Sequence, residues 1–202
     1  MKDQDAFERT IFNKKNALNT AIVIVNIAVF ICVSLMGDTG DTELMIKMGA
    51  EYAPLIQQGQ WYRLFTAMFL HFGVAHLAGN MIVLFFLGAY AQRYLGWLKY
   101  AVVYFGGGLL GNAFSYLMDL KNNDMGSVSA GASGAIFAVI GALLVIMLMN
   151  GKRLEDITLP QLILFIGLQV ITTFTETNID IAGHLGGFAG GAILALIISK
   201  VS

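Results

Sequence analysis

The 202-residue chain is poor in charge, in cysteine and in proline. Only 12% of its residues are charged and 57% are hydrophobic, whereas a soluble domain carries about 25% charged residues. Its net charge of -1 lacks the basic excess typical of nucleic-acid binders. One cysteine, Cys32, excludes an intrachain disulfide framework and a multi-cysteine zinc site. Two prolines argue against long disordered linkers. A single membrane-embedded domain is the class that these absences leave.

The charged residues leave six uncharged stretches that are long enough to cross a bilayer. A spanning helix needs about 20 mostly apolar residues, and its backbone must satisfy its own hydrogen bonds in hydrocarbon. We therefore predict an all-α, polytopic membrane protein with six transmembrane helices, forming one domain over residues 16–202 after a short cytoplasmic tail at 1–15. The stretches are 16–37, 64–92, 100–118, 125–151, 157–175 and 181–199.

Two other readings of these stretches are disfavoured. A soluble helical bundle would keep a charged face on its helices. A secretory signal peptide is disfavoured because the first apolar stretch is long and no clear small-residue cleavage site follows it at Gly37–Asp38.

The basic residues predict the orientation. Six spans put both termini on one side, and Lys and Arg in short loops concentrate on the cytoplasmic side. Nine of the twelve fall on the side of the termini, so we expect a multi-pass protein of the cell membrane with both termini cytoplasmic. The first outer loop, about 37–63, is apolar enough to lie in the membrane interface. The nine residues are Lys2, Arg9, Lys14, Lys15, Arg93, Lys99, Lys152, Arg153 and Lys200.

Four polar residues on three predicted spans converge at one depth. Ionisable side chains inside a membrane are costly and mark candidate functional sites. With this orientation, His76 and Asn80 lie in the outer half of the second span and share a helix face. Ser133 and His184 lie near the outer ends of the fourth and sixth spans. The sequence therefore predicts a polar site near the outer surface.

Ser133 stands in the sequence Gly131-Ala132-Ser133-Gly134. A serine in a membrane helix usually serves packing, but flanking glycines clear space for a reactant and allow a tight turn. A serine at a helix N-terminus also lies beside unpaired N–H groups and the positive end of the helix dipole, which suit an oxyanion. Ser133 is therefore a candidate nucleophile.

His184 precedes Gly187 and Gly191, whose spacing favours close packing against a neighbouring helix. If that neighbour is the fourth span, His184 meets Ser133, and a neutral imidazole is a competent base for a serine hydroxyl. The alternative is a histidine that is hydrogen-bonded for structure alone.

The histidine spacing argues against a metal site. His71 and His76, five residues apart, would not share a face of one continuous helix. No HExxH sequence is present to place two zinc ligands and a base together. We therefore expect no metal and no cofactor.

Together these residues resemble the rhomboid family of intramembrane serine proteases. The resemblance runs from about Trp61 to the end of the chain. It implies that Ser133, in the family's GxSG motif, is the nucleophile and that His184 is the general base. The HxxxxHxxxN signature is matched by His71, His76 and Asn80. Further motif residues are Trp61, Arg63, Gly131, Gly134, Gly187 and Gly191.

The resemblance also implies roles and partners. The side chains of His76 and Asn80, with the Ser133 backbone N–H, would bind the oxyanion, while His71 would support the first loop. Substrates would be other transmembrane proteins, cut in or near a membrane segment at its outer end after a small residue. Membrane lipid is the other partner that the resemblance implies. It implies neither a nucleic-acid partner nor a metal.

The chain departs from the family pattern at three positions. Phe137 stands where many members have a tyrosine packed on the histidine, and Gly183 replaces the usual alanine. Gln92, between Gly88 and Gly96, replaces a common glutamate, so we expect a changed hydrogen bond to the first loop.

Two other function classes remain as alternatives. A non-catalytic rhomboid-like binder of membrane proteins predicts loss of Ser133 or His184, and both are present. A small transporter with a histidine proton relay predicts an internal repeat, and no convincing one is found.

The surroundings of the site carry three further expectations. Asp180, four residues before His184, is expected to be structural, which leaves a serine–histidine dyad. Water needs a cavity open to the outer face beneath residues 37–63. A lateral gate is expected in the fifth span, whose polar residues include Gln169, Thr172 and Thr173.

Overall fold

The computed structural model describes residues 16–150, 153–154, 157–174 and 180–200, and most of these are helical, which confirms the all-α prediction for them. The predicted tail at 1–15 lies outside the described residues. Four two-residue strands pair antiparallel as β1 (Glu51–Tyr52) with β2 (Val128–Ser129) and β3 (Arg153–Leu154) with β4 (Ile157–Thr158). The helices are α2 (Ala17–Ser34), α3 (Thr42–Met48), α4 (Ala53–Gln57), α5 (Arg63–Thr66), α6 (Gly73–Val83), α7 (Ala89–Leu95), α8 (Trp97–Ala101), α9 (Gly107–Asn122), α10 (Ser133–Met149), α11 (Leu159–Phe174) and α12 (Ile181–Lys200).

Short irregular turns join several of these helices. The 3-10 turn η2 (Ala67–Phe69) follows α5. The π-helical turns η3 (Leu84–Gly88) and η4 (Val102–Gly106) connect α6 to α7 and α8 to α9, so each pair forms one longer helical segment.

Several of these helices are apolar enough for a membrane. Among the described residues, four helical segments have the length and hydropathy to cross one: Ala17–Ser34, Gly73–Leu95, Trp97–Asn122 and Ile181–Ser199. Two shorter apolar helices, Ser133–Met149 and Leu159–Ile171, accompany them. The fold is therefore that of a multi-pass membrane protein, and six complete crossings stay a prediction.

Two of the predicted stretches extend beyond their helices. Residues 64–72 include most of α5, then η2 and a short non-helical connection before α6 begins, and residues 125–132 form a turn, the strand β2 and irregular chain before α10 begins. A glycine with positive φ stands at each boundary, Gly73 at 79° and Gly131 at 148°, a conformation that side chains other than glycine rarely adopt. The absence of charge predicts apolarity, but it does not predict where a helix begins.

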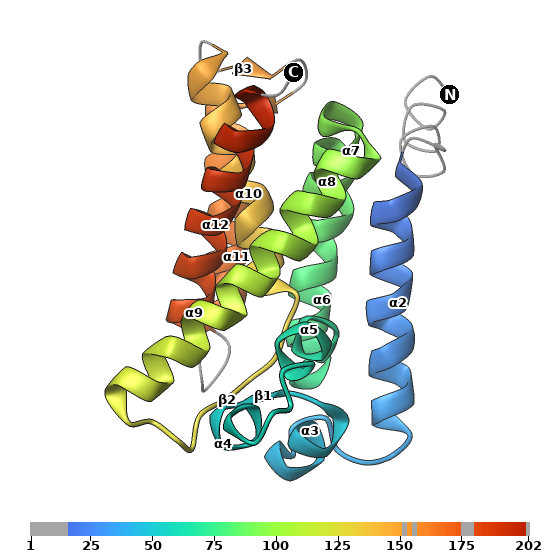
Figure 1. Cartoon of the computed structure of the whole chain (residues 1–202). Coiled ribbons are helices and arrows are strands. Elements are labelled where there is room, and N and C mark those ends of the chain that lie inside the picture. Colours follow the sequence, from blue (N-terminus) through green and yellow to red (C-terminus); the bar gives the residue numbers. More distant parts are fainter. Residues whose placement is uncertain (1–15, 151–152, 155–156, 175–179, 201–202) are drawn as a thin grey trace, which may run out of the picture.

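The helices form a bundle with two distinct ends (Figure 1). At the α7–α8 end lie the start of α2, the α7–α8 connection and the last turns of α10 and α12. At the β1–β2 end lie α3, α4 and the first small sheet. The chain runs from β2 toward the middle of the bundle before α10 begins (Figure 1). Ser133, the first residue of α10, is therefore recessed from the β1–β2 end.

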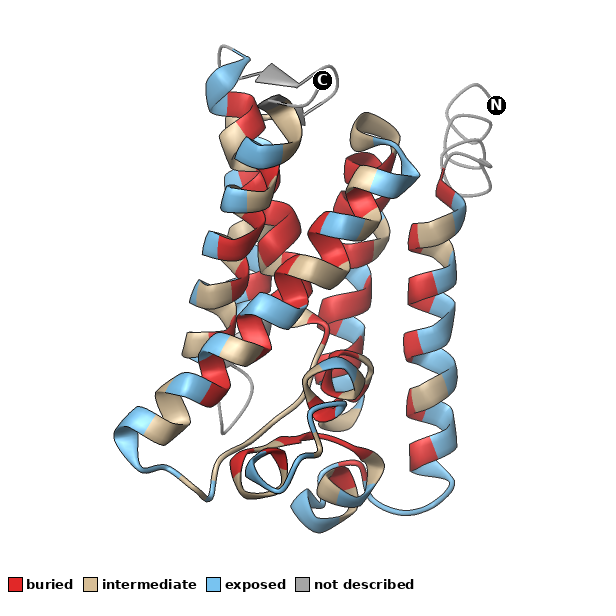
Figure 2. Ribbon diagram, in the orientation of Figure 1, coloured by how far each residue is buried: buried red, intermediate tan, exposed pale blue. Residues whose placement is uncertain are grey.

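α12 lies against α10 with almost no space between their backbones. A Cβ atom at Gly187 would collide with the Gly134 carbonyl oxygen, and one at Gly191 would collide with the Ala138 carbonyl oxygen. The facing sides of these helices are buried (Figure 2). Small residues allow such close packing in membranes, and the contact fixes the register in which His184, three residues before Gly187, faces α10.

α2 packs at the edge of the bundle, with its buried side toward the other helices (Figure 2). The backbone N–H of Asn19, in the first turn of α2, donates to Gln92 Oε1 at 2.6 Å, and the Tyr100 hydroxyl donates to Asn19 Oδ1 at 2.6 Å. The expectation was a changed hydrogen bond from position 92 to the first loop, and the hydrogen bond that Gln92 accepts comes from α2 instead. Gln92 lies in α7, at the opposite end from that loop, and satisfies a helix-terminal N–H that lacks an intrahelical acceptor.

The first outer loop is folded and fixed to the bundle. The Arg63 guanidinium, 4% exposed, donates to the carbonyl oxygens of Ile46 at 2.7 Å and Ala50 at 2.9 Å. The ring of Trp61 meets Tyr116 of α9 edge-on, with centroids 5.8 Å apart. The Trp61–Arg63 motif therefore holds the loop against α9, while pairing of β1 with β2 joins it to the segment before Ser133.

Glu51 in β1 is a buried carboxyl at this end of the bundle. It is 1% exposed, and neither of its oxygens accepts a well-formed hydrogen bond from the described residues. Burial is the main cause that raises the pKa of Glu51 well above its usual range, and the charges of Asp180 and Asp119 add to it. Interactions with Ser115 and Tyr116 lower this pKa, but their effect is weaker. The folded chain therefore holds this proton to higher pH than the unfolded chain does.

Gly191→Ala is expected to lower the free energy of unfolding by about 1–3 kcal/mol, because the added methyl group overpacks a filled contact with Ala138. The measurement is the midpoint of thermal unfolding in detergent. Gly167→Ala in α11 is the matched control, since a Cβ there meets nothing within 4 Å; it is expected to be neutral or slightly stabilising. Equal losses in both variants would contradict the close contact.

Glu51→Gln is expected to raise the unfolding midpoint at neutral pH. Because the folded-state pKa of Glu51 lies above its usual value of 4.5, stability from this group is lost as pH rises from 4.5 toward the folded-state pKa. The advantage of glutamine should therefore fade as pH falls toward 4.5. The exposed Glu43→Gln in the same loop serves as the control. A Glu51→Gln protein less stable than wild type at neutral pH would contradict this assignment.

Candidate active site

Ser133 and His184 meet between α10 and α12. Ser133 is the first residue of α10, and His184 lies in the first turn of α12. The Ser133 Oγ and His184 Nε2 atoms are 2.8 Å apart across 51 residues of sequence. This is hydrogen-bonding distance, the separation at which an imidazole can take a hydroxyl proton.

The His184 ring is held from one side by Phe137. The two rings stack with centroids 4.6 Å apart and planes 28° apart. Phe137 lies one turn after Ser133 on α10, so both face α12. The phenyl ring thus provides the packing surface without the hydroxyl that a tyrosine would bring.

Asp180 caps the helix that carries His184. Its Oδ1 accepts the Gly183 N–H at 2.6 Å, its Oδ2 accepts the Ser129 hydroxyl at 2.9 Å, and its backbone oxygen accepts the His184 N–H at 3.1 Å. A carboxylate in this place satisfies helix-terminal N–H groups and favours the positive end of the dipole. In the part of the chain that the structure describes, no carboxylate is hydrogen-bonded to the His184 ring, so the arrangement is a pair.

Gly131 lies directly against His76 and close to Ser133. A Cβ at Gly131 would lie 2.8 Å from His76 Nε2 and 3.4 Å from Ser133 Oγ. Both atoms therefore border the volume that a side chain at 131 would fill. The Gly131 N–H donates to the Ala67 carbonyl at 2.9 Å, which fixes this part of the chain to η2. The absence of a side chain at Gly131 therefore lets His76 Nε2 approach the start of α10.

Asn80 is oriented by a residue of α11. Its Oδ1 accepts the Gln169 Nε2–H at 2.9 Å, while no described residue pairs with its Nδ2 donor. Asn80 and Gln169 are each 1% exposed. Gln169, which was expected in a lateral gate, is buried against Asn80, and the gate itself stays a prediction. The side chains of Thr172 and Thr173 lie outside the described residues.

His71 lies behind this group. Its Nε2 accepts the Ala132 N–H at 3.4 Å, and its ring contacts the His76 ring edge-on at 4.9 Å. These contacts lie at the start of α10 and in α6, and a role of His71 in supporting the first loop stays a prediction. The two histidines approach because α6 begins at Gly73, which leaves His71 outside the helix. Among the described residues, no group of three or more His, Cys, Asp or Glu side chains is arranged to hold a metal.

A small cavity opens beside Ser133 and His184. Its volume is about 20 Å³, which is room for about one water molecule. Its walls come from Ala67, from Asn112 of α9, from the segment 129–134 and from residues 180–184. A cavity open to the outer face beneath residues 37–63 stays a prediction. Asn112 lines the small cavity and donates to the Leu64 carbonyl at 2.7 Å. Asn112 is not among the predicted site residues, although a polar residue in an uncharged stretch was a signal for it.

Comparisons with known proteins agree on one family. The Rhomboid domain model matches residues 58–201. The chain is 33% identical over 195 residues to Rhomboid protease GluP of Bacillus subtilis, covering 96% of this chain and 37% of GluP. It is 31% identical over 142 residues to Putative rhomboid protease YdcA of Bacillus subtilis, and this match covers 70% of this chain and 69% of YdcA. RHOMBOID-like protein 5 of Arabidopsis thaliana is 34% identical over 154 residues, covering 75% and 48%.

The chain spans less than half the length of GluP and of the Arabidopsis protein. The family match nevertheless includes the helices that carry the serine–histidine pair, the two neighbouring histidines and the capping aspartate. The chain belongs to the rhomboid family.

Proposed function

We propose that this chain is an intramembrane serine endopeptidase that cleaves transmembrane segments of other membrane proteins near the outer face. Ser133 is its nucleophile and His184 its general base. The observation that carries the proposal is the 2.8 Å separation of Ser133 Oγ and His184 Nε2 at the recessed start of α10. The names of GluP and YdcA, both rhomboid proteases as printed, support the same class.

The proposed reaction has two proton-transfer cycles. His184 Nε2 takes the Ser133 proton as Oγ attacks the scissile carbonyl carbon, and the imidazolium then protonates the leaving amine, which leaves an ester on Oγ. A water molecule next gives a proton to His184 as its oxygen attacks the ester. The proton returns to Ser133 Oγ when the carboxylic acid product leaves.

The negative charge of each tetrahedral intermediate needs donors beside Ser133. The Ser133 N–H belongs to the first turn of α10, where N–H groups lack intrahelical acceptors and the helix dipole is positive. His76 Nε2 lies against Gly131, two residues before Ser133, and the Nδ2 donor of Asn80 is unpaired among the described residues. In the proposal these three groups bind the oxyanion, and losing one such donor typically costs about 10²–10³ in rate.

The same proposal includes a membrane orientation. Six helices of the domain 16–202 cross the cell membrane, with both termini cytoplasmic, in agreement with the positions of the basic residues. The β1–β2 end then faces outward, and the cleaved bond lies near that face. The cavity of about 20 Å³ supports a small residue before the cut, because a large side chain does not fit beside Ser133.

Ser133→Ala is expected to abolish cleavage of a single-pass model substrate in liposomes, because no nucleophile remains. Labelling by a fluorophosphonate should be lost in Ser133→Ala and strongly reduced in His184→Ala, because the serine is then no longer activated. Ser34→Ala, whose hydroxyl donates to a carbonyl within α2, is the control and should keep both properties. If wild type and Ser133→Ala yield equal product, the peptidase proposal is wrong; substrate capture without cleavage by wild type would favour the binder.

Gln169→Met is expected to lower kcat with little change in KM, because Asn80 loses the contact that aims its free donor. The loss should be smaller than the about 10²–10³ expected for removing an oxyanion donor itself. In the Asn80→Ala background the same substitution should have no further effect on kcat. Gln161→Met is the matched control, because Gln161 bonds Thr158 at the other end of α11. Additive losses in the double variant would show that Gln169 acts through general stability.

A further inference from the structure

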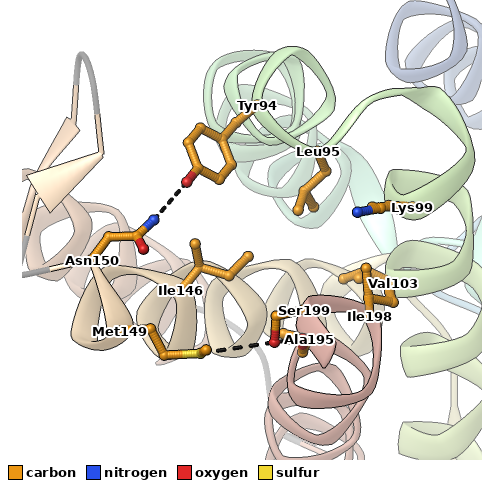
Figure 3. Close-up of a pocket in the computed structure, with 10 residues that line it drawn as sticks. All are labelled: Tyr94, Leu95, Lys99, Val103, Ile146, Met149, Asn150, Ala195, Ile198 and Ser199. Atoms are coloured by element: carbon orange, nitrogen blue, oxygen red, sulfur yellow. Dashed lines mark hydrogen bonds between the residues drawn. The ribbon is translucent and has the colours of Figure 1, made fainter. Parts of the chain in front are cut away.

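A second hollow opens at the α7–α8 end, opposite the end near which Ser133 lies. Its volume is about 260 Å³, and α7, α8, η4, α10 and α12 line it (Figure 3). This is far more than the about 30 Å³ of a water molecule and slightly less than the smallest pockets that enclose a whole small-molecule ligand, about 300 Å³. The hollow therefore suits part of a larger molecule.

The floor of the hollow is apolar. It includes Val103, Ile146 and Ala195, which are all buried. Each lies four residues from a polar residue of the same helical segment that is closer to the end of the bundle. These polar partners are Lys99, Asn150 and Ser199. One helical turn thus separates an apolar inner tier from a polar outer tier on three sides.

The outer tier offers an amide side chain and a positive charge, whereas the Ser199 hydroxyl donates to the Ala195 carbonyl at 2.8 Å. Asn150 Nδ2 donates to the Tyr94 hydroxyl at 2.7 Å, which joins α10 to α7 across the rim. The Lys99 ammonium end points into the hollow (Figure 3). Lys99 also has an interaction within the protein, but an ammonium has three N–H donors. Among the described residues that line the hollow there is no carboxylate.

We propose that this hollow binds one anionic phospholipid of the surrounding membrane. The lipid phosphate lies at the side chains of Lys99 and Asn150. The first part of one acyl chain lies over Val103, Ile146 and Ala195. Basic pockets between transmembrane helices bind acidic lipid headgroups by this combination of charge and apolar surface. A zwitterionic lipid offers the same chain, but its own cation offsets the phosphate charge. The proposal rests on the membrane setting of the fold and is independent of peptidase activity.

The bound lipid also joins the helices of the proposed active site. α10 and α12 contribute to the hollow near their last turns and carry Ser133 and His184 at their first turns. A ligand that binds only the folded chain raises its apparent stability. Lipid binding should therefore be visible as a higher unfolding midpoint.

The test uses the full chain, purified in detergent and delipidated. Phosphatidylglycerol or phosphatidylcholine with identical acyl chains is added, and bound lipid is counted by native mass spectrometry while unfolding is followed by heating. Phosphatidylglycerol should bind more tightly and raise the midpoint more. Lys99→Gln should weaken phosphatidylglycerol binding about fivefold, the equivalent of about 1 kcal/mol for one basic residue, and remove the preference.

Arg93→Gln is the matched control, because Arg93 carries the same charge at the same end without lining the hollow. It should keep the preference for phosphatidylglycerol. Ser199→Leu, which fills the hollow from its rim, should weaken the binding of this lipid through its chain. Equal binding of the two lipids, equal effects of the Lys99 and Arg93 variants, or undiminished binding by Ser199→Leu would overturn the proposal. An equal rise of the unfolding midpoint with inorganic phosphate alone would also overturn the lipid proposal. So would a peptide that displaces the lipid equally well from wild type and from the Lys99 variant.

Discussion

The contact between the backbones of α10 and α12 is the constraint on which the rest depends. Gly187 meets the carbonyl of Gly134, and Gly191 meets the carbonyl of Ala138, with no room for a Cβ. In a membrane, where apolar side chains gain little by leaving lipid, such close packing is a principal source of helix association. This contact fixes the rotation of α12 about its own axis and its position along α10. The approach of His184 to Ser133 is a consequence of this fixed packing.

The β1–β2 end adds a second set of connections to this frame. β2 pairs with β1 of the outer loop, and Ser129 of β2 donates to Asp180, which caps α12. The loop, the segment before Ser133 and the helix of His184 are thus joined through one short strand. A displacement of the loop would therefore be transmitted to both members of the serine–histidine pair, which links access to the site with its geometry.

The sequence predicted the all-α class and the approximate place of each apolar helix, because charge is costly in hydrocarbon and its absence is easily read. It did not predict where α6 and α10 begin, since those boundaries depend on glycine conformations and tertiary contacts. The sequence also predicted a common membrane depth for Ser133, His184, His76 and Asn80. The roles of these four residues stay a prediction. The contact of Gln92 with Asn19 and of Gln169 with Asn80 could not be predicted, because each joins helices whose relative rotation is set by packing.

The scarcity of charge explains why a pair of residues has to carry the proposed chemistry. The carboxylate nearest to His184 in sequence, Asp180, already accepts hydrogen bonds from Gly183 and Ser129. Glu51 is buried close to it, and burial together with the charge of Asp180 raises the pKa of Glu51 well above its usual range, which shows that this place disfavours additional negative charge. Another ionised carboxylate against the His184 ring would have to be desolvated in the same place, at a cost of several kcal/mol per ion. Asp180 orients α12 through its cap, and stacking on Phe137 orients the ring; both do so without a further buried charge.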